Sequence, residues 1–232
     1  MNRNSVKKIT IILFLGIVFT SVFKLSASEL PVQKVHLLPA SLVSLKTTSD
    51  NYFDSIQTTS VGYLLWSNFP VNVYLDKLPS SDDLSAESKR LKNWTIQANL
   101  SIAHWSKYIP LKLVSNSDDA DIIIKREHPP LNGLFARSGQ TSYHIYASKH
   151  QQEHVLRQIM TIKIEPGLPE YILQDTIEHE LGHALGIWGH SPNPNDRMYA
   201  SQSSNSQSIS RRDINTLIKI YQQSTSLGWP IS

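Results

Sequence analysis

The sequence predicts an α+β domain. Its mixed, mostly parallel, twisted sheet is expected to carry a long N-terminal helix, a second helix with a histidine-rich motif, and a C-terminal helix. Two observations favour this fold class. Short segments with strand-like patterns are interspersed with longer segments whose apolar residues recur at helical spacing. Their order is strand, helix, strands, helix, irregular loop, helix, which is typical of an α+β domain with one sheet.

The first half of the domain is expected to contain a strand, a long helix and two further strands. Alternating apolar and polar residues at 71–75 predict the first strand. Apolar side chains recur at helical spacing over residues 84–108 and predict an amphipathic helix that ends just before a proline. Two short apolar runs, at 111–114 and 120–125, then predict two strands.

The second half is expected to add two strands and two helices. Residues 141–147 and 156–164 have strand-like patterns. The next helix opens at Pro169 and is expected to stop at Gly186, because glycine readily adopts the left-handed conformation that ends helices. After a polar, irregular loop, the sequence SRRD at 210–213 resembles a capping box and predicts the start of the closing helix.

The chain is expected to comprise four parts. Residues 1–28 resemble an export signal, since a positively charged start is followed by an apolar run at 9–23 and by small residues at a cleavage site. An uncleaved membrane anchor is the alternative, although about 20 apolar residues are normally needed to span a bilayer. Residues 29–60 lack sustained periodicity and are interpreted as a leader, linker or short propeptide, 61–225 as the domain and 226–232 as a tail. In either case we expect an exported domain, secreted or periplasmic, with membrane contact only through an uncleaved N-terminal segment.

The charge balance gives no indication of a nucleic-acid partner. The formal net charge of the whole chain is +3, but residues 1–28 contribute four basic residues and no acid, so the remainder has a net charge of −1. No stretch rich in lysine and arginine with interleaved aromatic residues remains. The chain has no cysteine, which excludes disulfides, a lipid-modified cysteine and a thiol nucleophile.

The stretch HELGHALGIWGHS, residues 179–191, predicts a metal site. A helix turns about 100° per residue, so His179 and His183 lie one turn apart on the same side and can bind one ion. Glu180 points toward the same edge, where it can hold a metal-bound water. Nitrogen ligands suit zinc, which lowers the pKa of a bound water to about 7. Glu180 can then accept the proton as the water attacks a carbonyl, and pass it to the leaving amine.

Three candidates remain for the third ligand. No glutamate follows Glu180, which excludes the class of zinc peptidases whose third ligand is a downstream helical glutamate. The local candidates are His190, Asp196 and, less strongly, Asp213. Gly186 can turn the chain sharply back, because glycine adopts positive φ without strain, so a ligand a few residues later can reach the ion.

The chain resembles the metzincin clan of zinc peptidases, and its matrixin-like branch in particular. HELGHALGIWGHS followed by RMYA is similar to the clan signature H-E-x-x-H-x-x-G-x-x-H with its methionine turn. The resemblance covers residues 66–221 and includes YIPLKLV, ADIIIK and SISRRDINTLIKIY. It implies a zinc-dependent endopeptidase acting on a protein or peptide substrate. The residues that it implies are the ligands His179, His183 and His190, the base Glu180, and Met198 beneath the metal.

Two departures from the family bear on this site. Three residues separate Gly186 from His190 where the family has two, whereas the spacing from His190 to Met198 matches. The extra residue therefore lies in IWG, where Gly189 can accommodate it as a bulge, so we expect His190 to remain the third ligand and Asp196 to support the loop. The family's cysteine switch is absent, and any latency must arise by other means.

A second metal is only weakly indicated. His128, His144, His150 and His154 fall where matrixins bind structural zinc and calcium. The aspartates and glycines that surround those sites in the family are largely missing, so surface histidines are favoured over a second Zn²⁺ or a Ca²⁺.

The leading hypothesis is an exported, monomeric zinc endopeptidase in which residues 141–147 offer a sheet edge to an extended substrate. The alternative is a non-catalytic exported binding module that keeps the fold. The intact Glu180 argues against it, because a binding protein needs no base there. A third hypothesis is a zinc hydrolase acting on other substrates, because ligands alone do not define the substrate.

Overall fold

The computed structural model of the chain describes residues 30–77, 85–130, 137–150, 153–200 and 208–231. The expected export signal at 1–28 lies outside these residues. Within the described part, no helix is long and apolar enough to cross a membrane.

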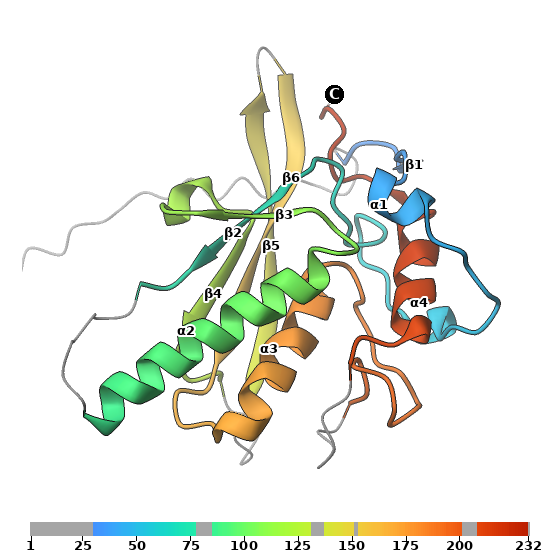
Figure 1. Cartoon of the computed structure of the whole chain (residues 1–232). Helices are drawn as coiled ribbons and strands as arrows, with labels where there is room; N and C mark the ends of the chain where they lie inside the picture. Colours follow the sequence, from blue (N-terminus) through green and yellow to red (C-terminus); the bar gives the residue numbers. More distant parts are fainter. Residues whose placement is uncertain (1–29, 78–84, 131–136, 151–152, 201–207, 232) are drawn as a thin grey trace, which may run out of the picture.

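The centre of the domain is a five-stranded mixed sheet (Figure 1). Its order is β3-β2-β4-β6-β5; the first four strands are parallel, and β5 lies antiparallel to β6 at one edge. The strands are β2 (Val71–Leu75), β3 (Leu111–Val114), β4 (Ile122–Arg126), β5 (Gly139–His150) and β6 (Glu153–Ile164). The predicted α+β class and the mixed, mostly parallel sheet are confirmed.

Two long helices pack together on one face of the sheet (Figure 1). They are α2 (Ala86–Trp105) and α3 (Glu170–Ala184). Alternate residues of β6 from Leu156 to Ile164 are buried beneath them, as expected for a strand with one covered face. The indoles of Trp94 and Trp105 in α2 are also buried. This packing fixes α3, whose C-terminal half carries the histidine motif.

The helix ends agree with the signals in the sequence. After α3 ends, Gly186 has a φ of 121°, the conformation in which glycine turns a chain away from a helix. The helix α4 (Arg211–Tyr221) opens with a capping box, in which the side chains of Ser210 and Asp213 each accept a hydrogen bond from the other's backbone N–H.

The segments that precede residue 61 and follow residue 225 pack against the rest of the structure. Residues 30–60, interpreted as a leader, linker or propeptide, run over the surface of α4 (Figure 1). They contain β1 (Lys34–Val35), α1 (Ala40–Val43) and the 3₁₀ turn η2 (Phe53–Ser55), and β1 pairs with β7 (Ser224–Thr225). Leu42 and Tyr52 are buried, as is Leu227 in the expected tail. These segments are held by single buried apolar residues, so their sequences have no periodic pattern from which the packing could be predicted.

Candidate metal centre

Three histidine side chains converge beside the C-terminal half of α3. The ligand nitrogens of His179, His183 and His190 all lie within 4.8 Å of one another. Nitrogens that share one zinc at about 2 Å are roughly 3–4 Å apart, so the three rings are close enough to bind one ion after small side-chain rotations. The structure therefore brings together the two helical histidines and the third histidine of the motif.

Backbone carbonyls orient the two helical histidines. Nδ1 of His179 lies 3.0 Å from the carbonyl oxygen of Arg197, and Nδ1 of His183 lies 2.8 Å from that of Ile187. Since a carbonyl can only accept, Nδ1 carries the proton in both rings and Nε2 is left to ligate. Metal-binding histidines usually have this arrangement, so the donor set fits a metal ion.

The three imidazoles are poised in the neutral form. Burial lowers the pKa of His179 to about 4 and holds that of His183 well below its ordinary value. The pKa of His190 is also lowered, by its partial removal from water. Because metals bind the neutral imidazole, no proton has to be displaced from these rings near pH 7.

The Glu180 side chain extends from α3 to the edge strand β5. The Thr141 hydroxyl is 2.7 Å from its Oε2, and the carboxylate is buried. Burial raises the pKa of Glu180 to about 7, against the opposing effect of the Thr141 hydrogen bond. A side chain at Gly139 would meet Glu180, with a Cβ only 2.7 Å from its Cγ. No pattern in the sequence indicated that Gly139 and Thr141 lie against the Glu180 side chain.

The loop to His190 is compact, and Gly189 has a different role from the one expected. Two successive hydrogen bonds span only two residues each. The N–H of Trp188 donates to the carbonyl of Gly186, and the N–H of Gly189 donates to the carbonyl of Ile187. The glycines with positive φ in the described part include Gly186 but not Gly189. A Cβ at Gly189 would instead lie 2.2 Å from the carbonyl oxygen of Ser55. Gly189 thus permits a close backbone approach.

Met198 packs beneath the histidine helix. Its side chain is fully buried, and a Cβ at Gly182 would lie 2.2 Å from its Sδ. Gly182 is therefore the helix residue that makes room for the methionine, a role that the sequence analysis did not assign.

Asp196 and Asp213 are not part of the converging group. Asp196 accepts hydrogen bonds from the Ser191 hydroxyl at 2.5 Å and from Nε of Arg212 at 2.9 Å. Asp213 accepts from the backbone N–H of Arg197 at 2.9 Å. Both carboxylates thus make hydrogen bonds with the loop between His190 and Met198.

A buried network of charged residues holds Arg197, the residue whose carbonyl contacts His179. The Arg197 guanidinium lies 2.9 Å from Asp175 and 2.9 Å from Glu178. Glu178 in turn lies 2.6 Å from Nδ1 of His104 on α2. Buried charges are costly unless paired, and this pairing fixes the residue whose carbonyl orients His179. Nothing in the sequence pattern distinguished Arg197.

Two aromatic side chains flank the histidines. The Trp188 ring lies edge-on to His183, with centroids 5.9 Å apart, and edge-on to Tyr143 at 5.2 Å. Tyr143 belongs to β5 and is partly exposed. Through these two ring contacts, Trp188 connects the edge strand β5 to His183.

Among the side chains that the structure describes, the other histidines do not form a second cluster. Nδ1 of His128 lies 2.7 Å from Glu165, and His144 stacks on Tyr146. In the described part of the chain, the histidine triad is the one group of three or more candidate ligands that converges.

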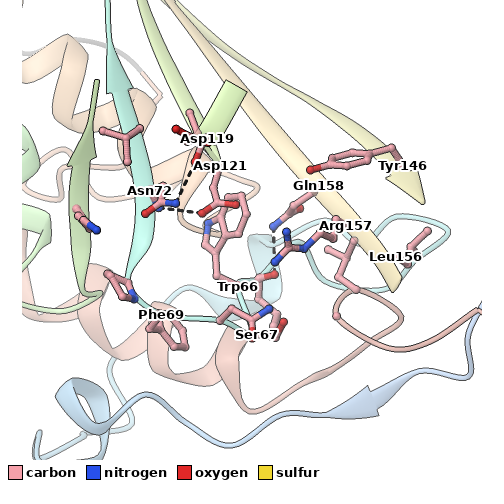
Figure 2. A pocket seen from close by; sticks show the side chains of 18 of the residues that line it. Trp66, Ser67, Phe69, Asn72, Asp119, Asp121, Tyr146, Leu156, Arg157 and Gln158 are labelled. Carbon is pink, nitrogen blue, oxygen red and sulfur yellow. Dashed lines mark hydrogen bonds between the residues drawn. The ribbon is translucent and has the colours of Figure 1, made fainter. Parts of the chain in front are cut away.

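A separate cavity of about 560 Å³ lies at the end of the sheet where β2 and β4 begin (Figure 2). Its lining includes none of the three histidines. Several of its polar groups satisfy one another: the backbone N–H of Asn72 donates to Asp121, and the Gln158 amide donates to the Leu65 carbonyl. This cavity is therefore distinct from the candidate metal centre.

Comparison with known proteins adds no relative. No protein-family model matches the chain, and no curated protein sequence matches it. The resemblance to metzincins thus stays a prediction from the sequence motif.

Proposed function

We propose that the protein is an exported zinc-dependent endopeptidase of the metzincin type. The observation that carries this proposal is the convergence of His179, His183 and His190 beside Glu180. Three neutral imidazoles with an adjacent carboxylate are the donor set of a catalytic zinc site, in which a fourth position stays free for water or substrate.

The chain's own residues account for the proton transfers. A zinc ion held by the histidines would supply Lewis acidity, which polarises a carbonyl and lowers the pKa of a water molecule. Glu180 then accepts the proton at its carboxylate as the water attacks the peptide carbonyl, and delivers it to the departing amine. The Thr141 hydroxyl holds Oε2 of this carboxylate in place for both steps.

The edge of the sheet supports a peptide as the substrate. β5 is an edge strand that lies directly against α3, and its Thr141 contacts Glu180. An extended peptide can add to such an edge through main-chain hydrogen bonds. The partly exposed Tyr143 and the neighbouring Trp188 offer apolar contacts to a side chain of that peptide.

A matched pair of glutamate variants tests the proposal. Glu180→Gln should keep about one zinc per chain and lose about 10²–10⁴-fold in turnover of a quenched peptide, because the base is deleted while the ligands remain. Glu170→Gln, at the exposed start of the same helix, should behave like wild type in both respects. Casein and the peptide should be cleaved without chelator and spared with it.

Each adverse result has a distinct meaning. Unchanged turnover in Glu180→Gln would refute the mechanism. Stoichiometric zinc without any peptide or casein cleavage would favour the non-catalytic binding module instead.

A further inference from the structure

We propose that residues 50–57 form a brace that positions the third ligand, His190, and therefore belong to the working site and not to a removable leader. We name this segment the N-terminal brace. The inference rests on the proposed zinc site. It concerns the segment from Gly186 to Met198, here called the ligand loop, which is one residue longer than in the family that the sequence resembles.

The first observation is the polar character of the buried side of α4. Asp213, Asn215 and Thr216 are all at most 2% exposed. Such buried polar groups are costly unless they are paired. The partners of Asn215 and Thr216 lie in and just before the brace. The Asn215 amide donates to the Asp50 carbonyl, and the Thr216 hydroxyl accepts from the Tyr52 N–H at 3.0 Å. Removal of residues 30–60 would take these partners away from the Asn215 amide and the Thr216 hydroxyl.

The second observation links the brace to the Met198 side of the loop. The Tyr52 hydroxyl donates to Oδ1 of Asp213 at 2.6 Å, and both residues are buried. The same carboxylate accepts from the backbone N–H groups of Arg197 and Met198, at 2.9 and 3.4 Å. The carbonyl of Arg197 is also the group that orients His179. Tyr52 is thus separated from the metal-ligand cluster by one carboxylate and one peptide unit.

The third observation links the brace to the His190 side of the loop. The backbone N–H of Gln57 donates to the carbonyl of Trp188 at 3.0 Å, and Ile56 pairs with Gly189 as an antiparallel bridge. Gly189 directly precedes His190, so the approach of the brace fixes the peptide that leads into the ligand.

A charged tie completes the arrangement. Arg212 pairs with Asp50 of the brace and donates through Nε to Asp196. Asp196 is held by the Ser191 hydroxyl, next to His190 in the chain. The brace therefore contacts the ligand loop directly through the backbone pairing, and it reaches the loop indirectly through two residues of α4, Asp213 by the tyrosine–carboxylate bond and Arg212 by the ion pair.

Two substitutions test the brace without touching a ligand. Tyr52→Phe removes only the hydroxyl that reaches Asp213. Gln57→Pro removes the N–H that reaches Trp188. The position is exposed, and the preceding residue, Ile56, is already extended (φ −89°, ψ 126°), as proline favours. Either change should weaken zinc binding about 10–100-fold, the usual cost of losing a group that orients a ligand.

The control removes a buried hydroxyl bond from the same N-terminal segment at a distance from the loop. The Ser226 hydroxyl donates to the Pro31 carbonyl, so Ser226→Ala should lower stability and leave zinc affinity unchanged. Zinc dissociation constants of the full-length chains are measured by competition with a chromogenic chelator. The measurements are made at a temperature at which circular dichroism shows that each apoprotein is fully folded. A loss of stability is then not mistaken for a loss of zinc affinity.

The outcomes separate this inference from the proposed function. Weaker zinc binding in Tyr52→Phe or Gln57→Pro, with Ser226→Ala unchanged, supports the brace. Wild-type affinity in both brace variants, or an equal loss in the control, overturns it while the zinc site stands. If the wild-type chain binds no zinc, the proposed function itself fails. A variant that does not fold is replaced by the other, since the two remove different bonds.

Discussion

The most discriminating prediction compares His190→Ala with Asp196→Ala. The sequence left both residues as candidates for the third ligand, and the structure gives them opposite surroundings. His190 is exposed and lies in the converging group, whereas Asp196 is 3% exposed and is engaged by Ser191 and Arg212. The two substitutions should therefore affect different properties of the protein.

The expected magnitudes follow from these contacts. His190→Ala removes the proposed third ligand, so zinc affinity should fall by more than the ~100-fold that an orienting group can cost, or more than about 2.7 kcal/mol. Because the side chain is exposed, the apoprotein should lose no more than about 0.5 kcal/mol in its free energy of unfolding. Asp196→Ala removes the buried acceptor of the Ser191 hydroxyl. It also removes one of the two carboxylates that pair with Arg212. It should cost about 1–3 kcal/mol in stability and weaken zinc binding less than His190→Ala does.

Chelator competition for zinc affinity and chemical denaturation of the apoprotein measure the two effects separately. The reasoning fails if Asp196→Ala abolishes zinc binding while His190→Ala retains it. It also fails if the two variants lose affinity equally, since the geometry gives Asp196 only a supporting role.

Three further predictions concern the surroundings of the site and the start of the chain. Met198→Leu should retain stoichiometric zinc and cost less than about 1.5 kcal/mol, because it conserves volume in a fully buried position, and loss of zinc would show that the sulfur has a larger role. Gly182→Ala should lower the Tm by about 2–8 °C, because the added Cβ would collide with the Met198 sulfur, and an unchanged Tm in thermal unfolding would contradict that packing. The exported protein should begin near Glu29, since the buried Pro31 is tied to Ser226; mass spectrometry of recovered material that still carries Met1 would favour the uncleaved anchor.

The parts of the fold that the sequence predicted are those with a repeating pattern. Strand β3 was expected at 111–114 and is found there, and helix α3 ends where Gly186 permits the chain to turn. The hairpin of β5 and β6 runs longer than expected, because its outer residues, up to His150 and from Glu153, pair with each other without an apolar face to mark them. An apolar pattern arises where one face of a strand is buried, so strand pairing between exposed residues cannot be recognised from such a pattern.

The site was predicted unevenly for a related reason. The spacing of His179 and His183 follows from helix geometry alone, so the motif was sufficient. Thr141 and Arg197 act through contacts between segments far apart in the sequence, with Glu180 and with the ring of His179. No local pattern encodes such contacts. Tyr52 is the clearest case, since an isolated tyrosine in an aperiodic stretch reveals its buried bond to Asp213 only in three dimensions.

The extra residue in IWG can now be explained by what its three members do. The carbonyl of Ile187 faces Nδ1 of His183, and the carbonyl of Trp188 accepts from the Gln57 N–H. Gly189 then brings the backbone against Ser55, as only a residue without a side chain can at that distance. A two-residue spacer could not provide all three contacts before His190. Two of these three contacts, those of Trp188 and Gly189, have their partners in the brace, so the longer loop and the N-terminal segment form one arrangement.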